Sequence, residues 1–179
     1  MAPLNQDALA ANIVGSLQKY EESALEAALA TTHGLPTLDY GGGDQFQDGA
    51  LHEWIQVRVV GPARPASMSG PYAPRVSAGN TRGAEIYWIL NINCFVRPAK
   101  QVPLNNIRIW HLRDIVLGAF AEGTLIPVKA WANTQEHIGN IIVDEILEDR
   151  PVSDPERSDL VQHNIVLALR WSETWVADL

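Results

Sequence analysis

The middle of the chain contains an uninterrupted apolar face with a period of two residues, which constrains the fold more than any other feature. From Ile86 to Val96 every second residue is apolar, and the opposite face carries Tyr87, Asn91 and Asn93. Successive side chains of a β-strand point to opposite faces, so this pattern predicts a strand whose apolar face packs on a core. The same period predicts three more strands, at Trp54 to Val60, Ile141 to Leu147 and Val161 to Trp171.

Two segments have the spacing of amphipathic helices. In the first, about Asn5 to Thr31, apolar residues recur at intervals of three, four or five: Leu9, Ile13, Leu17, Tyr20, Leu25 and Leu29. The second runs from about Asn105 to Ala121, and the stretch Thr124 to Ala130 after it predicts a short strand that Pro127 confines to an edge or a bulge. The segment Leu38 to Gly49 is expected to be a turn-rich connector.

These elements predict one domain over residues 1–179 with an α+β fold. A mostly antiparallel sheet with a long hairpin arm would pack against two helices, the first of them within residues 1–34. Both helices are expected on one face of the sheet.

The arm is the segment Gly61 to Gly83, which separates two predicted strands. Its 23 residues include four Gly, four Pro and three Arg but no Asp or Glu, so it carries a formal +3 in a chain of net charge −8. A hairpin needs a much shorter connection, and loops of this length are usually functional or disordered. A disordered loop is one interpretation. The other is an arm that reaches a neighbouring copy through Arg64, Arg75 and Arg82, with apolar anchors at Met68, Tyr72 and Val76.

The composition predicts neither a catalytic centre nor a metal or cofactor site. Cys94, the single cysteine, lies in an apolar strand and is expected to be a buried, inert thiol. The five His lack the spacing of a zinc site, and no nucleophile elbow or phosphate-binding loop is present. The acidic stretch from Asp144 to Asp159 is expected to be a solvated hairpin end rather than a cation site, and the same charge could meet a basic partner surface.

The net charge and the hydropathy indicate the surroundings of the chain. A charge of −8 opposes tight binding of nucleic acid, although loose passage of DNA is compatible with it. No apolar run of about 18 residues is present, and the N-terminal residues have neither a basic leader nor an apolar core. We therefore expect a soluble protein that is not exported and has no membrane partner.

The order of these segments resembles the tail terminator, or tail completion, proteins of long-tailed, siphovirus-like phages. The resemblance covers nearly the whole chain and is one of element order and pattern. It is carried by the N-terminal helix, LHEWIQVRVV, the hairpin arm, EIYWILNINCFV, IRIWHLRDIVLGAF, IIVDEILEDRP and HNIVLALRWSETW.

The resemblance implies a structural virion protein of the tail and neck, assembled in the host cytoplasm, with no enzymatic activity. Such a subunit forms a homo-oligomeric ring, a hexamer, that caps the tail tube protein and stops its polymerisation. The ring joins the tail to the head connector or head-closure protein, and double-stranded DNA passes through its lumen without being read. The expected contact residues are Arg64, Met68, Tyr72, Arg75, Arg82, Trp110, His111 and Trp175.

Two alternative functions remain open from the sequence. One is a head-closure or connector protein of the same neck. The other is a small ligand-binding or hydrolytic module with its site under the arm, which would need a concave pocket with convergent polar groups.

Overall fold

The computed structural model describes residues 9–27, 37–39, 53–62, 75–76, 81–97, 105–130, 136–152 and 160–176. In β1, in β3 and at the ends of several other elements, it describes the backbone alone.

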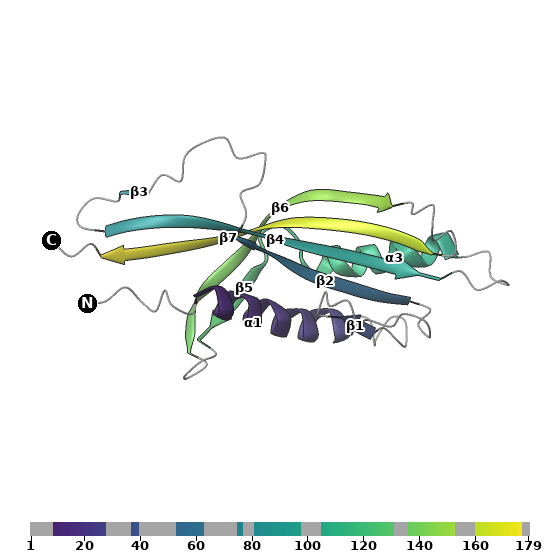
Figure 1. Cartoon of the computed structure of the whole chain (residues 1–179), viewed down its shortest axis with the longest axis horizontal. Helices are drawn as coiled ribbons and strands as arrows, with labels where there is room; N and C mark the ends of the chain where they lie inside the picture. Colours follow the sequence, from purple (N-terminus) through teal and green to yellow (C-terminus); the bar gives the residue numbers. More distant parts are fainter. Residues whose placement is uncertain are drawn as a thin grey trace.

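The described chain is built on a curled sheet with the strand order β1-β2-β4-β7-β6-β5, and β3 pairs with β4 outside this order (Figure 1). All pairs are antiparallel except β1 with β2. The strands are β1 Thr37–Asp39, β2 Glu53–Pro62, β3 Arg75–Val76, β4 Thr81–Val96, β5 Leu125–Lys129, β6 His137–Val152 and β7 Val161–Val176. The predicted α+β class with a mostly antiparallel sheet is confirmed.

Two helical segments pack on the sheet. α1 spans Leu9–Glu21 and continues into a π-helical turn, η2, at Glu22–Glu26, and α3 spans Asn105–Ala119. The π-turn accounts for the interval of five residues between Tyr20 and Leu25, because a π-helix pairs residues five apart. Both side chains can therefore lie on the inner side of the helix, where Leu25 is fully buried.

A single hydrophobic cluster joins these layers. Apolar residues alternate inward along β4 and β7 and meet apolar residues of α1, η2 and α3. Tyr20 links the two helices: its hydroxyl donates to the carbonyl oxygen of Ala119 at 2.7 Å, and its ring packs edge-on against Phe120. The backbone N–H of Lys129 donates to Ser16 Oγ at 2.9 Å, which fixes α1 on β5.

β4 and β7 are longer than their alternation predicted. The sequence interpretation began β4 at Ile86 and ended β7 at Trp171, whereas the two strands pair residue by residue from Thr81↔Val176 to Val96↔Val161. The added residues continue the main-chain ladder, which does not require apolar side chains. The resulting β4–β7 ribbon extends past both helices (Figure 1).

The other strand predictions also need correction. β6 was predicted over Ile141 to Leu147 but covers His137–Val152, with irregularities of register between Val143 and Glu145 and between Ile146 and Glu148. The residues Asp144 to Asp149 therefore lie in a paired strand and not in a solvated hairpin end. β5 is an edge strand that contains Pro127, as predicted.

The predicted connector Leu38 to Gly49 is wrong at its start. Leu38 and Asp39 belong to β1, which adds a short parallel strand beside β2 at the end of the sheet. The rest of that connector lies outside the described residues.

Candidate functional site

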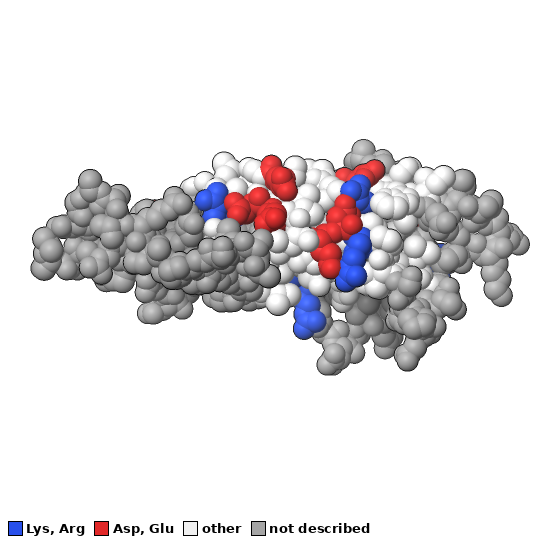
Figure 2. All heavy atoms as spheres, turned by 90° about the horizontal axis from the view of Figure 1, so that it is seen from above, with Lys and Arg blue, Asp and Glu red and all other residues white. Residues whose placement is uncertain are grey.

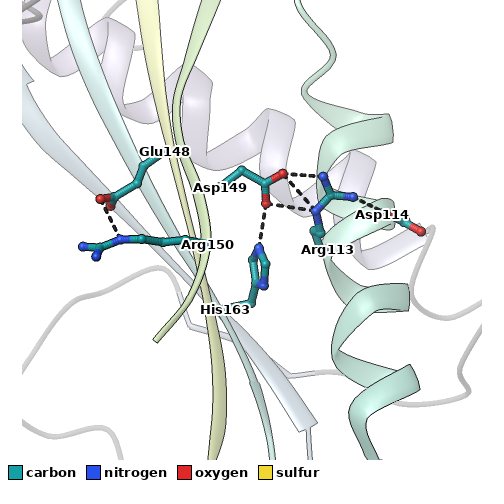
Figure 3. A network of polar contacts seen from close by, with 6 residues as sticks. All are labelled: Arg113, Asp114, Glu148, Asp149, Arg150 and His163. Atoms are coloured by element: carbon teal, nitrogen blue, oxygen red, sulfur yellow. Dashed lines mark hydrogen bonds and ion pairs between the residues drawn. The ribbon is translucent and has the colours of Figure 1, made fainter. Parts of the chain in front are cut away.

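A network of charged side chains joins α3 to β6 and β7 around Asp149 (Figure 3). The guanidinium of Arg113, on α3, donates from Nε to Asp149 Oδ1 at 2.9 Å and to Oδ2 at 3.0 Å, and its Nη2 also bonds Oδ2. Its Nη1 donates to Asp114 at 2.8 Å. The Arg113 guanidinium, more than any other group, holds the pKa of Asp149 below its ordinary value. The carboxylate therefore stays ionised and bonded at neutral pH.

His163 is the buried member of this network. It occupies an inward position of β7, where its neighbours on the same face are apolar, and its side chain is only 2% exposed. Its Nε2 lies 2.6 Å from Asp149 Oδ1. A buried imidazole needs such a partner, because an unpaired polar group in a core costs about 1–3 kcal/mol.

The network also holds an exposed tryptophan in place. The ring of Trp110 packs edge-on against the His163 ring with centroids 5.1 Å apart, and the Arg113 guanidinium lies 5.6 Å from the Trp110 centroid. Trp110 nevertheless remains 47% exposed, and Ile107, one turn earlier on α3, is 49% exposed. The inner stripe of α3 is buried in the core, so this helix presents a second, uncovered apolar surface.

Cys94 stands directly opposite His163 in the β4–β7 pairing. Burial raises the pKa of its thiol to about 12, and the negative charge of Asp149 acts in the same direction. The predicted burial of this cysteine is confirmed. Although Cys94, His163 and Asp149 have the residue types of a nucleophilic triad, the thiol is protonated and shielded from solvent and therefore provides no nucleophile.

The opposite face of the sheet carries a ladder of side-chain amides. Asn164 Nδ2 donates to Asn91 Oδ1 at 2.7 Å and to Asn93 Oδ1 at 2.8 Å, and Gln162 Nε2 donates to Asn93 Oδ1 at 2.8 Å. These residues alternate with the core residues of β4 and β7, as the sequence pattern predicted. The ladder joins the two central strands by uncharged contacts.

The predicted contact residues fall into three groups. Trp110 and His111 are exposed on α3. Arg75 lies in β3, Arg82 in β4 and Trp175 in β7, and the register makes Arg82 the pairing partner of both Val76 and Trp175. Residues 64, 68 and 72 lie outside the described residues. The structure thus brings Arg75, Arg82 and Trp175 together at the end of the β4–β7 ribbon.

Sequence reasoning missed Arg113, Asp149 and His163. One signal was present: His163 falls on the apolar face of its predicted strand, where a polar residue needs a buried partner. The partner itself could not be identified, because the contacts join residues far apart in the sequence. Asp149 lies 14 residues before His163, and Arg113 lies 36 residues before Asp149.

Within the described ranges, no group of three or more His, Cys, Asp or Glu side chains is placed to hold a metal ion. No helix in this part of the chain is long and apolar enough to span a membrane.

Comparison with known proteins identifies no family. No protein-family model matches the chain, and no curated protein matches it. A solved structure without a descriptive name aligns with 92% of this chain and 97% of its own at 11% identity, with a TM-score of 0.43. A likeness at this level assigns neither a family nor a function.

Proposed function

We propose that this protein is a structural subunit of a phage tail, a tail terminator that forms a ring on the end of the tail tube. The ring stops polymerisation of the tube protein and joins the tail to the head connector, with DNA passing through its lumen. Its function then resides in contact surfaces, the expected ones being the arm, the end of the β4–β7 ribbon and the exposed side of α3.

The observation that best supports this proposal is the β4–β7 ribbon. It projects beyond the two helices, and the arm Gly61 to Gly83 leaves β2 near the middle of β4, at the level of Trp88, and returns into β4 at the projecting end (Figure 1). A projecting element at one end and an uncovered apolar helix surface elsewhere give a subunit two different contact regions. Such heterologous contacts form rings when their rotation closes.

Arrest of tube growth tests the proposal. The purified protein, added in excess to polymerising tail tube protein of the same phage, is expected to give short tubes of fixed length, each capped at one end by a ring in negative-stain images. The control is the same protein after thermal unfolding. Tubes that grow to the same length with the folded and the unfolded protein would contradict the proposed function.

Removing the basic charge of the arm is expected to weaken ring formation. Replacing Arg64, Arg75 and Arg82 together with serine removes the arm's three cations, which are suited to pairing with carboxylates of a neighbouring subunit. We expect at least a tenfold higher concentration for half-assembly, measured by sedimentation or negative-stain counting. The control replaces three cations outside the arm and outside β6 and α3, Lys19, Arg58 and Lys129, and so changes the net charge equally. Equal assembly of both variants would show that the arm's arginines have no special part.

A further inference from the structure

The exposed side of α3 combines apolar surface with carboxylates. Ile107 and Trp110 are about half exposed, and Asp114, one turn after Trp110, has a side chain that is 65% exposed. We call these three residues the Trp110 face. Because Trp110 is already held by His163 and Arg113, little side-chain entropy remains to be lost on binding, which is typical of an interface anchor.

The Trp110 face borders an acidic ridge along β6. Arg113, which contacts Trp110, also bonds Asp149, and three further carboxylates lie earlier on β6, at Asp144, Glu145 and Glu148. Glu148 points to the other side of the strand from Asp149, so the ridge takes in both sides of β6 (Figure 3). With Asp114 and Glu122, the ridge has six carboxylates. Three arginines bond to them, so the ridge keeps a formal charge of −3: Arg113 to Asp149 and Asp114, Arg150 to Glu148, and Arg170 to Asp144. Figure 2, which views the side on which β6 lies, shows acidic side chains gathered in bands with basic ones beside them.

The arm has the complementary chemistry. Gly61 to Gly83 carries a formal +3 with no carboxylate, together with apolar side chains at Met68, Tyr72 and Val76. Its basic groups match the ridge, and its apolar groups match the Trp110 face. Opposite potentials across an interface favour correct pairing and fast association.

The arm of the same chain cannot reach the Trp110 face. Pro62 pairs at the level of Trp88, and Arg75 pairs at the level of Gly83. The Trp110 face lies near the level of Cys94, the partner of His163. To touch the Trp110 face, the arm would have to run from the level of Trp88 to that of Cys94 and then back to that of Gly83. At about 3.3 Å per residue, this path measures about 55 Å. The segment from Pro62 to Arg75 spans at most about 45 Å when fully extended. Figure 1 accordingly shows β3 and α3 at opposite ends of the molecule.

We propose that the arm Gly61 to Gly83 of one copy docks on the Trp110 face and acidic ridge of the next copy. This inference rests on the ring assembly of the proposed function and names the contact that builds the ring. The contact is head-to-tail, because each copy gives its arm at one end and its α3 surface at the other. Every subunit of a closed ring then has both halves of the contact satisfied.

Cross-linking between introduced cysteines tests this contact, and the single native thiol, Cys94, is buried and contributes little background. Protein with Tyr72→Cys, mixed with protein carrying Ile107→Cys and treated with a short bifunctional maleimide, is expected to give a covalent dimer. The double variant is expected to give a ladder that ends at the ring size. The control replaces Ile107→Cys with Leu125→Cys, which is also an exposed apolar position, at 57%, but lies on β5. Equal dimer yields in both mixtures, purely intramolecular products, or a chain that remains monomeric and gives no product would overturn the proposal.

A second variant separates this contact from the proposed function. Trp110→Ala is expected to weaken assembly at least tenfold while Leu125→Ala does not, and 300 mM salt is expected to weaken assembly of the parent protein through screening of the ridge and the arm. Rings that stop tube growth without the Tyr72 to Ile107 cross-link would refute the contact and leave the function standing. Cross-linked rings that leave tube growth unchanged would refute the function and leave the contact standing.

Discussion

Replacing Glu21 with glutamine is expected to abolish most of the loss of stability that the parent protein shows between pH 5 and pH 8. Glu21 lies at the junction of α1 and the π-turn, is 1% exposed, and has a carboxyl oxygen, Oε1, with no hydrogen-bond partner. Burial, assisted by the charge of Glu22, raises the pKa of this carboxyl from 4.5 to about 8. The shift corresponds to about 3–5 kcal/mol of destabilisation once the group is ionised.

The direction of this pH dependence follows from the raised pKa. The folded chain holds the Glu21 proton more tightly than the unfolded chain, so the proton's stabilising contribution is complete below about pH 4.5 and is lost as the pH rises to about 8. Urea unfolding at pH 5, 6, 7 and 8 measures the effect. Glu26→Gln is the matched control, since Glu26 is an exposed member of the same turn. If Glu21→Gln and the parent chain lose stability in parallel over this range, the carboxyl is not buried as the structure describes.

Replacing Asp149 with alanine is expected to lower the free energy of unfolding by about 2–4 kcal/mol. The change leaves the buried His163 ring without its partner and removes the main partner of Arg113. Leaving one buried polar or charged group unpaired destabilises the fold by more than the intact pair stabilises it. Chemical unfolding monitored by far-ultraviolet circular dichroism measures the loss. The emission of Trp110 should also change, because its two neighbours lose their anchor.

Asp114→Ala is the control for this variant. Asp114 bonds the same arginine, but its side chain is 65% exposed, and exposed ion pairs contribute about 0–1 kcal/mol. Because the pKa of Asp149 is lowered in the folded chain, its stabilisation is present at neutral pH and is lost as the pH falls below the ordinary carboxyl range. Equal losses for Asp149→Ala and Asp114→Ala would contradict the central place of Asp149 in the network.

The strands were predictable because their inner faces are apolar without interruption. The alternation of Ile86 to Val96 is sufficient to identify β4, but a main-chain ladder can continue without alternation, so the first five residues of this strand were missed. β1 has only three residues, too few for an alternating pattern to be recognised, and it is a strand because it pairs with β2. The π-turn was visible only as an interval of five residues.

The sequence predicted only those residues of the candidate site whose chemical type alone marks them as contact residues. Trp110 and His111 stood out as an aromatic pair on an amphipathic helix, and both are exposed. The Arg113, Asp149 and His163 contacts depend on which side of β6 Asp149 occupies. Simple alternation from Ile141 places Asp149 on the inner side, as the structure does, but only because the two irregularities of the strand cancel.

Those two irregularities act as a matched pair. Strict alternation after Val143 would have placed Glu145 over Leu167, inside the core, whereas the first irregularity places Ile146 there instead. The second restores odd-numbered residues to the inner side, which places Asp149 opposite Ile165 and within reach of His163. If one irregularity were smoothed out with no residue lost, the parity of the rest of the strand would invert and Asp149 would be separated from its partners, whereas smoothing out both would return Glu145 to the core. Deleting the extra residue at either point, Asp144 or Leu147, would by contrast leave Asp149 opposite Ile165, so these are the two positions where the strand can lose a residue without changing that pairing.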